Sequence, residues 1–267
     1  MDIAILSKQE IITPLINLTI PALLLLGYLL IMFLITHIKK DISIGNFTWG
    51  GAVMLLTLYS FFTNPFLARH ILITTLIMIW GIRLTILLYL RYKKGADPRY
   101  VSWQNQHGAW ALLFAIIWIF VLNGGFGTVM ALPSFAVNLS TIPGINFLDI
   151  LGVLLWLKGF WWESISDYQL FSFIKNPANK GKIMDQGLWH YSRHPNYFGE
   201  ITLWWGIYLI ALSVHYGYLT IIAPLAITIS LLFVTGIPMN EKPMENNAAY
   251  QEYKKRTSAL IPWFPKK

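Results

Sequence analysis

One short stretch of the sequence concentrates side chains that can bind a small polar ligand. Residues 191–200 read Tyr-Ser-Arg-His-Pro-Asn-Tyr-Phe-Gly-Glu and stand at the start of an apolar run. Arg193 suits a phosphate, because a guanidinium pairs with phosphate oxygens through two parallel hydrogen bonds. Asn196 and Glu200 suit the polar edges of the same ligand. A bare loop needs no such density of hydrogen-bonding groups, so the pattern predicts a nucleotide site.

A basic segment precedes this stretch. Lys175, Lys180 and Lys182 lie among Gly, Pro and Asn residues, which are typical of a loop. Ammonium groups in such a loop can contact the phosphates of a nucleotide. Anionic lipid headgroups attract the same residues, so this segment alone does not identify the ligand.

Several ionisable residues stand inside or beside apolar runs. Each costs a few kcal/mol at membrane depth and is therefore a candidate for function. Glu163 and Asp167 are four residues apart and would share one helix face. Lys158 has a second interpretation, in which its ammonium reaches the membrane surface. The members of this set are Arg83, Lys158, Glu163, Asp167 and Glu200.

Metal and thiol chemistry receive little support. His190 and His194 have the spacing of a metal-binding pair, but Pro195 disfavours helical geometry at His194 and no third ligand is apparent. The sequence contains no cysteine, which excludes thiol catalysis, cysteine-bound zinc and disulfides. We expect no metal at this site.

The elements that must position these residues are membrane helices. Of the 267 residues, 56% are hydrophobic and 12% are charged, against about 25% charged residues in a typical soluble domain. Runs of about 20 apolar residues suffice to cross a bilayer. This composition excludes soluble enzymes, nucleic-acid-binding proteins and secreted disulfide scaffolds. We predict an all-α integral membrane protein with seven transmembrane helices near 15–38, 47–66, 70–92, 108–132, 146–166, 197–214 and 217–237.

The positive charges predict an orientation for these helices. Sixteen of the 20 Lys and Arg residues fall in loops on one predicted side, and only Lys8 and Arg69 fall on the other. Lys and Arg gather in cytoplasmic loops, so the N-terminus is predicted outside and the C-terminus in the cytoplasm. No internal repeat or long linker is visible. We therefore predict a single transmembrane domain over 1–267, in contact with the lipid bilayer.

The motif at 187–200 resembles the signature of bacterial membrane proteins related to the steroid 5α-reductases. The resemblance covers roughly residues 80–265. This superfamily also holds sterol reductases and isoprenylcysteine carboxyl methyltransferases. The matching residues outside the motif are Trp80 to Leu84, Arg91, Asp97 to Tyr100, Glu163, Asp167, Gln169, Asn176, Pro177, Gly236 to Pro238, Glu241, Tyr250, Tyr253, Thr257, Pro262 and Trp263.

The resemblance implies an NADPH site that faces the cytoplasm, in a multi-pass protein expected in a bacterial inner membrane. Asn196, Glu200 and Asp167 would lie at the nicotinamide end, and Lys175 and Lys182 near the phosphates. The full set implied for cofactor binding is Arg91, Arg99, Glu163, Asp167, Lys175, Asn176, Lys182, Trp189, Tyr191, Arg193, His194, Asn196, Tyr197, Glu200, Glu241 and Lys242.

The implied reaction is reduction of the C4–C5 double bond of a 3-oxo-Δ4 steroid or a similar apolar enone that enters from the membrane. A hydride would reach the β-carbon while a proton donor polarises the carbonyl oxygen. The animal enzymes use a Glu and a Tyr on the second and third spans, but this sequence has no acidic residue between Asp41 and Asp97. Tyr59, Arg83 and Tyr89 are the candidates for that catalytic role, with Asn64 as another polar residue of the region.

Two other functions stay open. A methyltransferase that uses S-adenosylmethionine on an apolar acceptor shares the Arg-His-Pro motif, but three lysines between 175 and 182 favour a phosphate-bearing cofactor. A transporter is less favoured, because no repeat is visible and the unusual polar residues cluster at one membrane face. We expect no nucleic-acid partner. The oligomeric state is left open, with a monomer as the expectation.

Overall fold

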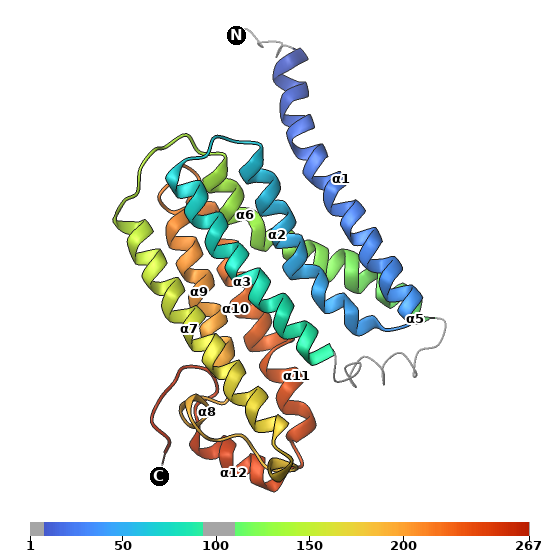
Figure 1. Ribbon diagram of the computed structural model, residues 1–267, viewed down its shortest axis with the longest axis vertical. Coiled ribbons are helices and arrows are strands. Elements are labelled where there is room, and N and C mark those ends of the chain that lie inside the picture. The colour runs from blue at the N-terminus through green and yellow to red at the C-terminus, as the bar shows by residue number, and fades with distance from the viewer. Residues whose placement is uncertain (1–7, 93–109, 267) are drawn as a thin grey trace, which may run out of the picture. The chain divides into compact units, whose positions relative to one another are not determined.

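The computed structural model describes residues 8–92 and 110–266, and within them every regular element is a helix (Figure 1). The all-α prediction is confirmed for this part of the chain. The described residues pack as two compact units, which comprise 8–66 with 70–92 and 110–138, and 67–69 with 139–266. We call them unit 1 and unit 2.

Unit 1 contains the first helices of the chain. They are α1 (Lys8–Lys39), α2 (Asn46–Phe62), α3 (Ala68–Tyr92), α5 (Trp110–Ile116) and α6 (Gly125–Asn138). Residues 67–69, which include the first two residues of α3, group with unit 2. The helices of unit 2 are α7 (Phe147–Lys175), α8 (Leu188–Tyr191), α9 (Pro195–Ala211), α10 (Ile222–Ile229), α11 (Ile237–Glu241) and α12 (Ala248–Arg256).

Four helical stretches are long and apolar enough to cross a membrane. They are Thr19–Lys39, Ala68–Tyr92, Leu113–Asn138 and Gly217–Met244. They correspond to four of the seven predicted spans. The other three predicted spans are helical over most of their length, but α2 and α9 have only 17 residues each and α7 carries several charges. Several apolar helices could therefore span a membrane, in keeping with a multi-pass protein.

Two of these stretches contain π-helical turns. The fourth predicted span contains Asn123 and Gly124, and the chain stays helical there through a π-helical segment, Ile117–Gly124, that leads into α6. A second π-helical segment, Ser230–Val234, follows α10. The wider turn accommodates an extra residue without ending the helix. Polar and glycine residues therefore did not mark a helix end in the fourth span.

Unit 1 is held internally by a buried polar network. The hydroxyls of Thr57 and Ser134 lie 2.8 Å apart, which joins α2 to α6. Asn138 Nδ2 donates to the Ser60 hydroxyl at 2.9 Å and to the Thr74 hydroxyl at 3.4 Å. All five side chains are buried. Hydrogen bonds of this kind connect helices where apolar surface gives little driving force for association.

Two pairs of glycines bring α7 and α9 together. An added Cβ at Gly152 would lie 2.6 Å from the carbonyl oxygen of Gly206, and one at Gly159 would lie 2.6 Å from that of Gly199. The two glycines are seven residues apart on each helix and are matched in opposite order, so the helices run antiparallel (Figure 1). Without side chains at these points, the two backbones approach directly.

The start of α7 is fixed by a buried ion pair. Asn146 caps the helix, and Asp149 completes a capping box by accepting from the Asn146 N–H at 2.8 Å. Arg69 donates to both carboxylate oxygens of Asp149, with Nε–Oδ1 and Nη2–Oδ2 distances of 2.9 Å. Arg69 also donates to the Ile142 carbonyl. Arg69 was placed in a polar loop by sequence, but it lies in the first turn of α3 and is buried.

Candidate functional site

An acid–amide pair lies where α7 passes the start of α9. Asn196 Nδ2 donates to Asp167 Oδ1 at 3.3 Å. A carboxylate only accepts hydrogen bonds, so the amide nitrogen of Asn196 must face it. The Asn196 Oδ1 atom is then buried with no hydrogen-bond partner in the structure. The pair thus presents an amide carbonyl that can accept a hydrogen bond from a ligand.

Two further carboxylates lie on the same two helices. Glu163 is buried one turn before Asp167 on α7, as the four-residue spacing predicted, so the shared face is confirmed. Glu200 is buried one turn after Asn196 on α9 and accepts from the indole Nε1 of Trp204 at 2.9 Å. The close packing at Gly159 and Gly199 places the two helices near one another at this level. We call Glu163, Asp167, Asn196 and Glu200 the acid–amide cluster.

Arg193 lies in a second cluster and its guanidinium is engaged within the protein. Its Nε donates to Glu241 Oε1 at 2.9 Å, and its Nη1 donates to the carbonyls of Thr257 at 2.6 Å and Lys254 at 3.2 Å. Arg193 and Glu241 are both buried. A buried charge needs such a partner, because leaving it alone would cost several kcal/mol. Arg193 thereby ties the start of α9 to α11 and α12.

His194 completes this second cluster, and we call Arg193, His194 and Glu241 the arginine cluster. Its Nε2 lies 3.0 Å from Glu241 Oε1, and its ring stacks on Tyr197 with centroids 5.3 Å apart. His194 has φ −137° and ψ 60°, outside the helical region, as Pro195 predicted. The Tyr197 hydroxyl accepts from Asn240 Nδ2 at 2.7 Å. The arginine cluster therefore reaches from Glu241 through His194 to Tyr197, one residue after Asn196.

The segment after α12 covers this cluster. Arg193 N–H donates to the Ser258 carbonyl at 2.8 Å, and Trp263 N–H donates to the Tyr191 carbonyl at 2.9 Å. The Ser192 hydroxyl donates to the Leu260 carbonyl at 2.8 Å. These three hydrogen bonds attach residues 258–263 to residues 191–193.

Two buried tyrosines of α12 line the inner side of the arginine cluster. Burial raises the pKa of Tyr250 above its ordinary value, and the nearby Glu241 carboxylate raises it further. Burial is also the largest cause of the raised pKa of Tyr253, whose hydroxyl donates to the Trp189 carbonyl. The raised pKa of both phenols reflects their burial, and Tyr253 uses its proton in the hydrogen bond to the Trp189 carbonyl.

The other predicted cofactor residues of unit 2 lie at the surface or serve local structure. Trp189 is buried and its indole donates to the Ser166 carbonyl at 3.0 Å. Asn176 caps a short 3-10 turn by accepting from the Ala178 N–H. The remaining four side chains are exposed, and they are Lys175, Tyr191, Lys182 and Lys242.

The predicted carbonyl-activating residues belong to unit 1. Tyr59 lies on α2, and Arg83 and Tyr89 lie on α3, as does Arg91. Tyr59 and Arg83 are half-buried, whereas Tyr89 and Arg91 are exposed. Arg99 lies outside the described residues. The structure therefore brings several predicted cofactor residues together in unit 2. The three catalytic candidates belong to unit 1.

Three residues that contact these clusters escaped the sequence analysis. They are Asn240, which donates to Tyr197; Lys254, whose Nζ lies 3.0 Å from Glu241 Oε2; and Trp204, which donates to Glu200. A signal existed only for Trp204, because Trp204 stands four residues after Glu200 on one helix. Among the described residues, no group of three or more His, Cys, Asp or Glu side chains could hold a metal ion.

These features define a helical protein with several apolar helices that could cross a membrane and two adjoining buried polar clusters. A family model described as DUF1295, protein of unknown function, matches residues 32–257. The chain belongs to this family, which is a membrane family that resembles the steroid 5α-reductases. No curated protein and no solved structure matched the chain.

Proposed function

We propose that the protein is an NADPH-dependent reductase of the C4–C5 double bond of a 3-oxo-Δ4 steroid or a similar apolar enone. The observation that carries this proposal is the acid–amide pair of Asp167 and Asn196, inside a family that resembles the steroid 5α-reductases. The buried Asn196 Oδ1 is an acceptor without a protein donor. The carboxamide of a nicotinamide ring has an NH2 group that can donate to it.

The charges around the site suit the rest of this cofactor. Lys175, Lys180 and Lys182 are exposed at the end of α7 and in the segment that follows, where they can contact phosphates. Arg193 has a different role in this proposal. Its guanidinium is held by Glu241 and two carbonyls, so it acts as a positioning residue that fixes the start of α9 beside Asn196.

The residues of the chain would place the reactants and hold the proton. NADPH, when bound, supplies the hydride for the β-carbon of the enone. Asp167 orients the Asn196 amide through its hydrogen bond, which keeps the carbonyl of that amide directed at the ligand. A proton must reach the substrate as well, and Tyr59, Arg83 and Tyr89 stay the candidates that polarise the substrate carbonyl. The apolar substrate would enter from the bilayer.

The proposal includes a topology. It assigns seven transmembrane helices, with the N-terminus outside and the C-terminus and cofactor site on the cytoplasmic side, in a bacterial inner membrane. The lysines of residues 175–182 and the acid–amide cluster would then meet soluble nucleotide. The distribution of Lys and Arg supports this orientation.

The first test is ligand binding to detergent-purified protein. We expect NADPH to raise the melting temperature, since a ligand at 100 times its dissociation constant stabilises the folded state by about 2.7 kcal/mol. NADH, which lacks the 2′-phosphate, should stabilise less. Stabilisation by S-adenosylmethionine alone would move the protein to the methyltransferase alternative. If neither type of ligand stabilises the protein, the reductase proposal fails.

A variant locates the site. Asn196→Ala removes the buried acceptor, and we expect the NADPH dissociation constant to rise about tenfold, the equivalent of about 1.4 kcal/mol. Asn246→Ala is the matched control, because Asn246 is exposed and has no hydrogen bond from its side chain in the described contacts. Equal NADPH affinity of the two variants would remove Asn196 from the site. Conversion of progesterone by the wild type, followed by chromatography, then tests the reaction itself.

A further inference from the structure

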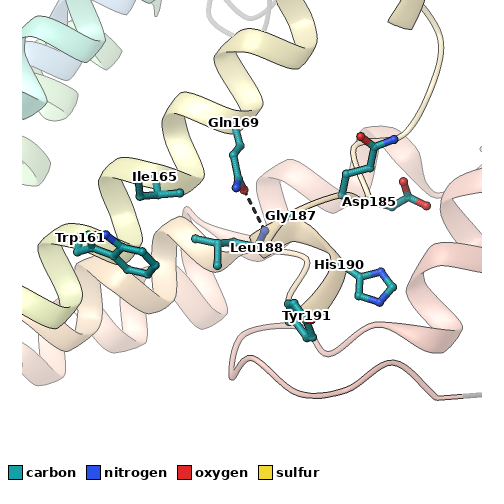
Figure 2. Close-up of a pocket in the computed structure, with 9 residues that line it drawn as sticks. Trp161, Ile165, Gln169, Asp185, Gly187, Leu188, His190 and Tyr191 are labelled. Atoms are coloured by element: carbon teal, nitrogen blue, oxygen red, sulfur yellow. Dashed lines mark hydrogen bonds between the residues drawn. The ribbon is translucent and has the colours of Figure 1, made fainter.

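A groove of about 500 Å³ lies on unit 2 beside the segment that precedes α9. One side is formed by Trp161, Ile165 and Gln169 of α7, and the other by residues 185–188, 190 and 191 (Figure 2). Its volume falls in the range of pockets that bind small ligands, about 300–1,000 Å³. None of the acid–amide cluster lines it.

The groove lies on the far face of α7 from the acid–amide cluster. Trp161, Ile165 and Gln169 follow one another at four-residue intervals. Each is displaced by two positions from Glu163 or Asp167, which on an α-helix is a rotation of about 200°. The two sets therefore point in opposite directions from one helix, and the groove is a separate site.

The polarity of the groove changes along its length. Trp161, Ile165 and Leu188 give apolar walls at one end, and Asp185 and His190 lie at the other (Figure 2). Trp161 is 54% exposed although it is a large apolar side chain. Such a surface fits a molecule that has a hydrocarbon end and a polar end.

The middle of the groove is held in shape. Gln169 Oε1 accepts from the Leu188 N–H at 2.9 Å (Figure 2). Gly187 has φ +60°, and a Cβ at this position would lie 2.5 Å from the Gln169 amide nitrogen. A side chain at residue 187 would therefore both strain the backbone and displace Gln169. This contact fixes the chain at residues 187–188 against α7.

Asp185 lines the polar end, and a cation that does not itself line the groove lies directly beside it. Asp185 pairs with Arg256 of α12 through the Nη2 group. The side chains are 36% and 47% exposed, so both keep surface for a ligand. A guanidinium has five N–H donors and a carboxylate has two acceptor oxygens, so this single contact uses only part of either group. A headgroup with an ammonium and a phosphate complements this arrangement, with the ammonium at Asp185 and the phosphate at Arg256 and His190.

We propose that this groove binds a zwitterionic phospholipid. One acyl chain lies along Trp161, Ile165 and Leu188, and the headgroup lies over the exposed side of the Asp185–Arg256 ion pair. The site belongs to the lipid-facing side of α7 and is independent of nucleotide binding. A phospholipid with a net negative charge and no ammonium group should bind less tightly than the zwitterionic lipid.

The test is native mass spectrometry of the full chain in detergent, titrated with lysophosphatidylethanolamine and with lysophosphatidylglycerol of the same acyl chain. We expect the ethanolamine lipid to bind about tenfold more tightly. Trp161→Ala should weaken its binding about tenfold, because it removes an aromatic wall. Trp263→Ala is the control, since Trp263 is 70% exposed and does not line the groove.

Each outcome decides the proposal. Equal binding of the two lipids overturns the headgroup assignment, and unchanged binding in Trp161→Ala overturns the location. If that variant does not fold, His190→Ala replaces it, because His190 is exposed at the polar end and should weaken the ethanolamine lipid. The melting temperature shift with NADPH, measured on the same samples, should not change in Trp161→Ala. Failure of the lipid proposal is thus distinguishable from failure of the reductase proposal.

Discussion

Glu241 is the residue that makes the burial of Arg193 and His194 possible. Its Oε1 contacts both side chains, and its Oε2 contacts Lys254. One carboxylate thus lies in contact with Arg193, His194 and Lys254 and supplies the counter-charge for the buried guanidinium. Because α9 begins beside this cluster, Glu241 affects the position of Asn196 without touching it.

Glu241→Gln removes the charge while it keeps the size of the side chain. We expect the free energy of unfolding to fall by about 3–5 kcal/mol, since a buried arginine loses its counter-ion. A thermal melt in detergent measures this loss. The control is Glu252→Gln, whose ion pair with Lys255 is 72% exposed on both sides and should contribute almost nothing. Equal melting temperatures for the two variants would contradict the role of Glu241.

Local spacing in the sequence predicted which residues share a helix face, but not which distant residues they contact. Glu163 and Asp167 share a buried face because helix periodicity alone places residues four apart together. The contact between Arg193 and Glu241 joins residues 48 positions apart. No local rule pairs them, so sequence reasoning assigned Arg193 to a phosphate, whereas its described contacts are within the protein.

At the scale of elements, the glycine contacts between α7 and α9 set the distance between the two helices. Gly159→Ala would place a Cβ 2.5 Å from the Leu203 backbone nitrogen, which cannot move as a side chain could. We expect a loss of about 1–3 kcal/mol. The same variant should weaken NADPH binding, because Asp167 and Asn196 stand on these two helices.

A matched glycine shows whether the helix contact is responsible. Gly125 begins α6, and an added Cβ there meets nothing within 4 Å. Gly125→Ala should therefore leave the melting temperature unchanged or raise it slightly, because alanine favours helix. The interpretation fails if Gly159→Ala is as stable as Gly125→Ala in the same melt.

The helix limits differ from the predicted spans for a physical reason. The fifth span was predicted over 146–166, but α7 continues to Lys175. Apolar residues indicate where a helix lies in a membrane, whereas backbone hydrogen bonds decide where it ends. The longer helix carries Asp167, whose four-residue spacing from Glu163 had already placed it on the same helix, and Gln169, which lies beyond the predicted span. Sequence reasoning thus found the helix and the face that carries Asp167, but not the point where the helix ends.

For the whole molecule, the predicted orientation can be tested because the chain has no cysteine. A single cysteine at Thr141 lies in the segment between α6 and α7, and one at Lys180 lies in the segment after α7. Both positions are exposed. We expect a membrane-impermeant maleimide to label Thr141→Cys on intact spheroplasts and Lys180→Cys only after permeabilisation. Labelling of Lys180→Cys on intact spheroplasts would reverse the topology.

Composition and apolar runs were enough to predict an all-α chain, and the described residues are helical, with four helices long and apolar enough to cross a membrane. A predicted span rests on the hydrophobicity of about 20 residues taken together, so it cannot show which single residues contact one another. The ion pair of Arg69 and Asp149 shows the limit of that average. Arg69 appeared as one charge in a loop, but it is a buried residue that holds the start of α7.

The glycine contacts also affect what related sequences can reveal. When two side chains are in contact, a substitution that enlarges one can be compensated by a substitution that makes the other smaller. Such correlated substitutions identify contacts in sequence alignments. Gly152 and Gly206 have no side chain to shrink, and neither do Gly159 and Gly199. Variation at one position cannot be compensated at the other. The closest approach of α7 and α9 should therefore leave no record of correlated substitution, and only invariance would mark it.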